Sequence, residues 1–170
     1  LNKYVVFHVD GDTVWSQKNS AEVFEKKELF LRAVKDALTT SYKPKVKTPL
    51  SGNEADDTIK NLFFLIPFYS IESWAYANKD KLIEFLPPRG NMSFDEKLVV
   101  DSPIQELDEI SQIKDKTSIK DSANYELFND SGWPRDELYN VQKSFYAVIE
   151  EMKQNSNLLA DLQKTADQPF

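Results

Sequence analysis

An apolar run that ends in two closely spaced carboxylates, near the start of the chain, constrains the fold most. Residues 4–9 are mostly apolar and lead directly into Asp10-Gly11-Asp12. A short unbroken apolar run that stops at a glycine is typical of a strand covered on both faces. Because ligands bind outside the carboxyl ends of strands in open α/β sheets, we expect Asp10 and Asp12 where a metal ion or a phosphate group would be bound.

The spacing of the two aspartates favours a cation. Side chains alternate along a strand, so Asp10 and Asp12 share a face if the extended geometry continues through Gly11. Two carboxylates on one side suit a hard cation, with Mg²⁺ the best candidate and Mn²⁺ an alternative. A structural explanation stays open, since Asp-Gly-Asp also suits a polar turn that closes a strand.

A second apolar run, residues 62–68, predicts a second strand that ends near Pro67. Apolar residues at helical spacing up to Leu38 predict a helix between the two runs, and a strand–helix–strand order favours parallel pairing. A helix is expected to begin at Ile71, directly after the second strand, which places Glu72 in its first turn and on the rim predicted for the aspartates. An acid in a first helical turn is also favoured by the helix dipole without any function.

The compact basic stretch of this acidic chain runs from Lys43 to Pro49 and includes Lys43, Lys45 and Lys47. Its prolines disfavour a helix and predict an extended, exposed segment. Such a segment could contact a nucleic-acid backbone through the three lysines. A solvated loop is the alternative, because no aromatic residue is interleaved for base stacking.

The remaining chain predicts mostly helices. Leu98-Val99-Val100 suggests a short strand ending in Asp101, which could instead cap a helix through Ile113. A long helix is predicted from Trp133 to Gln154, and a last helix follows Ser156. We therefore expect one α/β domain over residues 1–170, with a small parallel sheet flanked by helices in residues 4–101 and a helical part in residues 102–170.

Composition limits the function classes. The 170 residues carry a formal net charge of −7, and 41% are hydrophobic. This balance predicts a globular protein that does not coat nucleic acid nonspecifically, although a local basic patch and a bound metal ion still permit a nucleic-acid enzyme. There are no cysteines, which excludes disulfides and thiolate chemistry. Without an apolar run long enough to span a membrane, or a secretory signal, a cytoplasmic protein is expected.

Three familiar chemistries fit poorly. His8 is the only histidine, and no G-x-S-x-G motif accompanies it, so we expect a buried, hydrogen-bonded imidazole rather than a catalytic one. The haloacid dehalogenase phosphatase loop would place His8 where that family has its nucleophilic aspartate. An EF-hand beginning at Asp10 fails because Val14 and Trp15 occupy positions for an oxygen ligand and a glycine.

The apolar strand that ends in Asp10-Gly11-Asp12 resembles the second acidic motif of Toprim-like proteins, the metal-dependent family of topoisomerases, primases and OLD-type nucleases. A group of small bacterial Toprim-like proteins follows this strand with a helix, a second apolar strand and an Ile-Glu-x-Trp segment, which Ile71-Glu72-Ser73-Trp74 resembles. The resemblance covers residues 4 to about 86. It implies that Asp10 and Asp12 bind Mg²⁺ and that Glu72 is a further acidic, catalytic residue.

Toprim domains also use a glutamate on an earlier strand, and no such strand precedes Leu1. Because the chain opens on leucine close to a strand, we expect that residues upstream are missing here; otherwise the site is incomplete.

Two functions follow as expectations. The first is a Mg²⁺-dependent nuclease or phosphoryl-transfer domain that acts on nucleic-acid phosphodiesters, with a small-molecule phosphohydrolase as a variant. The second is a non-catalytic assembly or regulatory protein, for example of a bacterial defence system, with a vestigial acidic site. It would bind a protein partner or its own copies through the tryptophan-rich surface expected around Trp15, Trp74 and Trp133.

Overall fold

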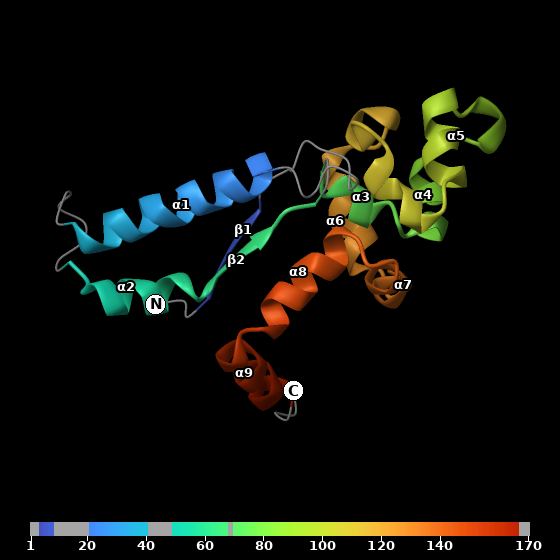
Figure 1. The fold of residues 1–170 in the computed structure, drawn as a ribbon. Coiled ribbons are helices and arrows are strands. Elements are labelled where there is room, and N and C mark those ends of the chain that lie inside the picture. The colour runs from blue at the N-terminus through green and yellow to red at the C-terminus, as the bar shows by residue number, and fades with distance from the viewer. Residues whose placement is uncertain (1–3, 9–20, 41–48, 68–69, 167–170) are drawn as a thin grey trace. The chain divides into compact units, whose positions relative to one another are not determined.

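The computed structural model of the chain describes residues 4–8, 21–40, 49–67 and 70–166 (Figure 1). Strand β1 (Val5–His8) is followed by helix α1 (Ala21–Thr39), helix α2 (Gly52–Ile59) and strand β2 (Leu62–Leu65). In the described part of the chain these strands form a small parallel sheet, and the rest is mostly helical. The predicted parallel pairing through a helical crossover is confirmed, and the composition of elements is consistent with the α/β class.

The remaining elements are short helices. They are α3 (Glu72–Ala75), α4 (Lys79–Phe85), α5 (Phe94–Asp101), α6 (Asp121–Asn129), α7 (Arg135–Asn140), α8 (Ser144–Lys153) and α9 (Ser156–Ala166), with 3-10 segments η2 (Arg89–Asn91), η3 (Ile104–Glu109) and η4 (Ile113–Lys116). No helix in the described ranges is both long and apolar enough to cross a membrane.

Contacts divide the described residues into two compact units. The first contains residues 4–7, 21–40, 49–65 and 150–166, and the second contains His8 with residues 66–67 and 70–149. The division of one domain into residues 4–101 and 102–170 stays a prediction.

The first unit is organised around aromatic rings from the sheet and α1. The Phe7 and Phe30 rings lie 4.9 Å apart, and both contact the ring of Phe64, at 5.8 and 5.6 Å between centroids. Phe64 is buried on β2. The helix predicted to end near Leu38 is thus confirmed, and it packs on the sheet through the face that carries Phe30.

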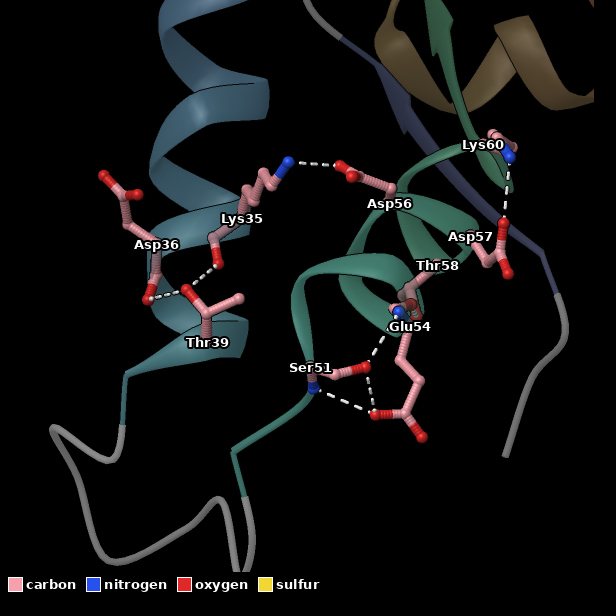
Figure 2. A network of polar contacts seen from close by, with 9 residues as sticks. All are labelled: Lys35, Asp36, Thr39, Ser51, Glu54, Asp56, Asp57, Thr58 and Lys60. Carbon is pink, nitrogen blue, oxygen red and sulfur yellow. Dashed lines mark hydrogen bonds and ion pairs between the residues drawn. The ribbon is translucent and has the colours of Figure 1, made fainter.

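Helices α1 and α2 contact each other and are joined by an ion pair. Figure 2 shows Lys35 of α1 extending toward Asp56 of α2, with 2.5 Å between Nζ and Oδ1. Both side chains are about half exposed, so this ion pair contributes at most about 1 kcal/mol.

A capping box starts α2. The Ser51 hydroxyl accepts a hydrogen bond from the Glu54 backbone N–H, and the Glu54 carboxylate accepts one from the Ser51 N–H (Figure 2). Ser51→Ala is expected to lower the free energy of unfolding by about 1 kcal/mol, because it leaves an N–H at the helix start without its partner. Urea denaturation measures this loss. Ser51→Thr, which keeps a hydroxyl cap, is the control, and an equal loss in both variants would contradict the prediction.

The second unit has its own core of apolar side chains from the short helices. Its members that are no more than 1% exposed are Ala75, Tyr76, Leu82, Val99, Leu107, Ile113 and Leu127. With Leu138 of α7, the core joins five helices and two 3-10 segments, which explains how such short elements are held in place.

Strand β1 differs from its prediction as a strand covered on both faces. Val5 and Val6 are 39% and 49% exposed, and His8 is also exposed rather than buried. The expectation that the His8 imidazole is buried is therefore wrong. The physical reason is the size of the sheet, since each strand has one described neighbour and the helices cover β2 better than β1.

The suggested strand at residues 98–100 is also wrong, because these residues belong to α5. Asp101 ends that helix instead of capping a following one, and the segment up to Ile113 contains the 3-10 segments η3 and η4. A capping box formed by Ser93 and Glu96 starts α5, and it outweighs the strand preference of the two valines.

The single helix predicted from Trp133 to Gln154 is interrupted. Helix α7 ends at Asn140 and α8 begins at Ser144, with Gln142 between them in the left-handed region at φ 55°. The helix predicted after Ser156 is confirmed as α9.

Candidate functional site

The two aspartates predicted to bind a metal ion, Asp10 and Asp12, lie outside the described residues, and so do Lys43, Lys45 and Lys47. What the structure describes is the approach to Asp10. Strand β1 ends at His8, and Asp10 is the second residue after it. Because β1 and β2 are parallel, their carboxyl ends lie at the same edge of the sheet.

Glu72 is the predicted site residue that the structure describes. It begins α3 and is only 5% exposed. Its Oε1 atom accepts a hydrogen bond from Asn124 Nδ2 at 3.3 Å and lies 3.8 Å from Lys114 Nζ. Lys114 Nζ also lies 3.3 Å from Asp121. The buried Glu72 carboxylate is therefore compensated by the Lys114 cation of η4 and the Asn124 amide of α6.

The surroundings of Glu72 contain further polar groups. Thr117 donates a hydrogen bond to the Tyr76 hydroxyl, with 3.3 Å between the oxygens. Burial raises the pKa of Tyr76, the Thr117 hydrogen bond opposes that shift, and the nearby Glu72 carboxylate adds to it. Tyr76 therefore stays protonated at neutral pH and adds a neutral hydroxyl beside Glu72.

Two buried polar atoms in the described ranges have no hydrogen-bond partner, Asn124 Oδ1 and Ser70 Oγ. A buried oxygen without a donor costs about 1–3 kcal/mol, so such an atom favours a bound water or cation. Asn124 Oδ1 belongs to the amide that holds Glu72. Carboxylate and amide oxygens are ligands that Mg²⁺ and Ca²⁺ accept, but the groups that face Glu72 Oε1 are the Asn124 amide nitrogen and the Lys114 ammonium.

No group of three or more His, Cys, Asp or Glu side chains suited to holding a metal ion occurs among the described residues, a set that excludes Asp10 and Asp12. The prediction that these two bind Mg²⁺ therefore stays a prediction.

A pocket of about 400 Å³ lies in the first unit, between α1, β2 and the start of α9. Lys27 and Glu151 line it and form an ion pair at 2.6 Å, and Lys27 Nζ also lies 5.2 Å from the centre of the Phe64 ring. The volume is in the range of small-molecule sites. The pocket could not be predicted from the sequence, because its walls come from residues separated by more than a hundred positions.

The buried amine of Lys79 has a strongly lowered pKa. Burial lowers the pKa of its amine to about 8, and the Asp101 carboxylate opposes this shift. The amine donates a hydrogen bond to the Val99 carbonyl near the end of α5. A cation at the last carbonyls of a helix is stabilising, so the amine has a structural role in holding α4 against α5.

The tryptophan-rich partner surface expected around Trp74 and Trp133 is wrong for Trp74, which is buried, while Trp133 is half-buried. Trp74 is 4% exposed, and both rings pack edge-on against Phe145. Trp133 Nε1 donates to the Trp74 carbonyl at 3.0 Å, and Trp74 Nε1 donates to Ser144 Oγ at 2.8 Å. The Trp74 ring is thus buried, and the half-buried Trp133 ring packs against the core of the second unit. Trp15 lies outside the described residues.

Comparison of the chain with protein-family models, with curated proteins and with solved structures found no match.

Proposed function

We propose that this chain is a Mg²⁺-dependent nuclease or phosphoryl-transfer domain of the Toprim-like type that acts on nucleic-acid phosphodiesters. One observation carries the proposal. The parallel β1–α1–α2–β2 crossover brings the carboxyl ends of both strands to one edge of the sheet, and β1 leads toward Asp10 and Asp12 in the sequence.

The roles of the residues follow from their chemistry. Asp10 and Asp12 would hold Mg²⁺, which when bound neutralises phosphate charge and activates water. Glu72 would act as a further acid or base, and Asn124 would fix the orientation of its carboxylate through the 3.3 Å hydrogen bond. Lys43, Lys45 and Lys47 would contact the phosphate backbone, which a chain with net charge −7 needs locally.

The experiment compares substrates and metals. The purified chain is incubated with single-stranded and double-stranded DNA, with RNA and with mononucleotides, each with Mg²⁺, with Mn²⁺ or with EDTA. Polynucleotide cleavage that requires the metal ion is the expected result. Cleavage of mononucleotides alone would indicate a small-molecule phosphohydrolase, and no cleavage of any substrate would contradict the proposal.

A second candidate function is a non-catalytic assembly protein, and the contacts of Glu72 favour it. A buried carboxylate that is paired with Lys114 and Asn124 has a sufficient structural reason to be present. In this function the protein would act through an exposed apolar surface instead of an acidic site.

Glu72→Gln distinguishes the two functions. Glutamine keeps an oxygen that can accept the Asn124 hydrogen bond but removes the charge. A catalytic Glu72 predicts a loss of cleavage of roughly 10²-fold or more, with the thermal unfolding curve nearly unchanged. Asp121→Asn is the matched control, since it removes a carboxylate from the same lysine without touching Glu72. Cleavage that is equal in both variants would favour the structural role.

A further inference from the structure

An open groove of about 400 Å³ on the second unit exposes apolar surface. Its walls are α5, which contributes Phe94 and Leu98, and the following segment, which contributes Pro103. Phe94 is 81% exposed and Leu98 is 39% exposed. An aromatic side chain this exposed next to an apolar groove marks an interaction surface more often than an isolated surface leucine does.

The groove also carries one charge of each sign. Lys97 lines the groove from α5 and Glu106 lines it from η3. Both are exposed, and neither side chain has an ion pair or hydrogen bond with any residue in the described ranges. The third charged side chain of the groove, Asp101, is already paired with Arg89 at 2.5 Å. Lys97 and Glu106 are thus available to a partner.

We propose that this groove binds the same groove of a second copy of the chain, in a two-fold symmetric dimer. Phe94 of each copy would cover the Leu98 and Pro103 surface of the other. Lys97 of each copy would face Glu106 of the other, which makes two equivalent ion pairs around the apolar contact. A two-fold interface brings one patch against itself, so it requires a patch that is complementary to itself.

The charge pattern favours a second copy over another kind of partner. A groove shaped for an acidic or a basic partner would carry charges of one sign, whereas this one carries a cation from α5 and an anion from η3. When two copies of the groove meet in a two-fold arrangement, Lys97 and Glu106 of each copy both pair with an opposite charge of the other. The net charge of −7 per chain opposes association at long range, so the dimer is expected to depend on protein concentration.

Sedimentation velocity over a concentration series tests the dimer, with three charge variants of the groove. K97E and E106K alone are each expected to weaken self-association by roughly tenfold or more, because each places two like-charged pairs in the interface. An equimolar mixture of K97E and E106K is expected to associate like the wild type. In that mixture each introduced charge meets the other, and the original Glu106 meets the original Lys97. The double variant K97E/E106K is expected to self-associate for the same reason.

Two further variants distinguish the effect of the groove residues from the effect of net charge. K120E makes the same change of net charge at an exposed lysine outside the groove, and it is expected to leave association unchanged. F94S is expected to weaken association by roughly 30-fold or more while circular dichroism stays unchanged, because Phe94 is largely exposed in the single chain. A wild type that stays monomeric, a mixture that fails to associate, or a K120E effect as large as that of K97E would overturn the proposal.

Discussion

Replacing Asp10 and Asp12 together by asparagine is expected to reduce metal-dependent cleavage by roughly 10³-fold or more. A bound divalent cation contributes several kcal/mol to stabilising the charge that develops in phosphoryl transfer, and each 1.4 kcal/mol is a factor of ten in rate. Asparagine keeps the size of each side chain but removes both negative charges, so the affinity for Mg²⁺ falls with the rate. The measurement is the initial rate of polynucleotide cleavage as a function of Mg²⁺ concentration.

The matched control is D56N/D57N. It also neutralises two aspartates that are close in sequence, but these lie on α2, where Asp56 pairs with Lys35 and Asp57 with Lys60. Its cleavage rate should equal that of the wild type. If D10N/D12N cleaves as fast as D56N/D57N, the two aspartates do not bind the catalytic metal, and the assembly function becomes the better explanation.

The order of elements in the first part of the chain could be predicted because its signals are local. Periodicity marked the helix up to Leu38, and Pro67 marked the end of the second strand, which stops at Leu65. The exposure of β1 could not be predicted, since an apolar run reports that a strand prefers burial but not how many neighbours the sheet provides. Val6 remains 49% exposed for that reason.

The errors in predicting the helices after β2 have two different causes. For α5, a local signal was present: Ser93 followed by Glu96 is the pattern of a capping box, and it identifies a helix start before the apolar triplet. For the break between α7 and α8, the cause is not local. Apolar spacing continues through the break, while Ser144 is held by Asp108, which lies 36 positions earlier.

The candidate site shows the same contrast. Glu72 could be selected from the sequence because it follows a strand at the start of a helix. Its partners could not be selected, since Asn124 is 52 positions away and contacts it only after α3 and α6 pack together. The groove on α5 was not predicted either, because exposed Phe94 looks in sequence like any core aromatic residue.

Ser144→Ala is expected to lower the free energy of unfolding by about 2–3 kcal/mol at neutral pH. The Ser144 hydroxyl accepts a hydrogen bond from Trp74 Nε1 at 2.8 Å and donates one to Asp108 Oδ2. All three residues are buried, so the substitution leaves the indole N–H without an acceptor and removes a donor from the carboxylate. Buried polar groups that lose a partner cost about 1–3 kcal/mol each. S102A, which removes an exposed hydroxyl bonded to the Leu98 carbonyl, is the control and should cost under about 0.5 kcal/mol.

The pH dependence of this loss has a definite sign. Burial raises the pKa of Asp108 above its ordinary value of 3.8, and the hydrogen bonds from Ser144 oppose that shift. A carboxyl whose pKa is raised by folding binds its proton more tightly in the folded state, so its contribution to stability falls as the pH rises from 3.8 through the raised value. Without the Ser144 hydroxyl the pKa rises further, and the fall extends to higher pH. The stability difference between wild type and S144A is therefore expected to grow from acid to neutral pH in urea denaturation. A stability difference that is constant, or larger in acid, would show that the pKa of Asp108 does not depend on the Ser144 hydroxyl.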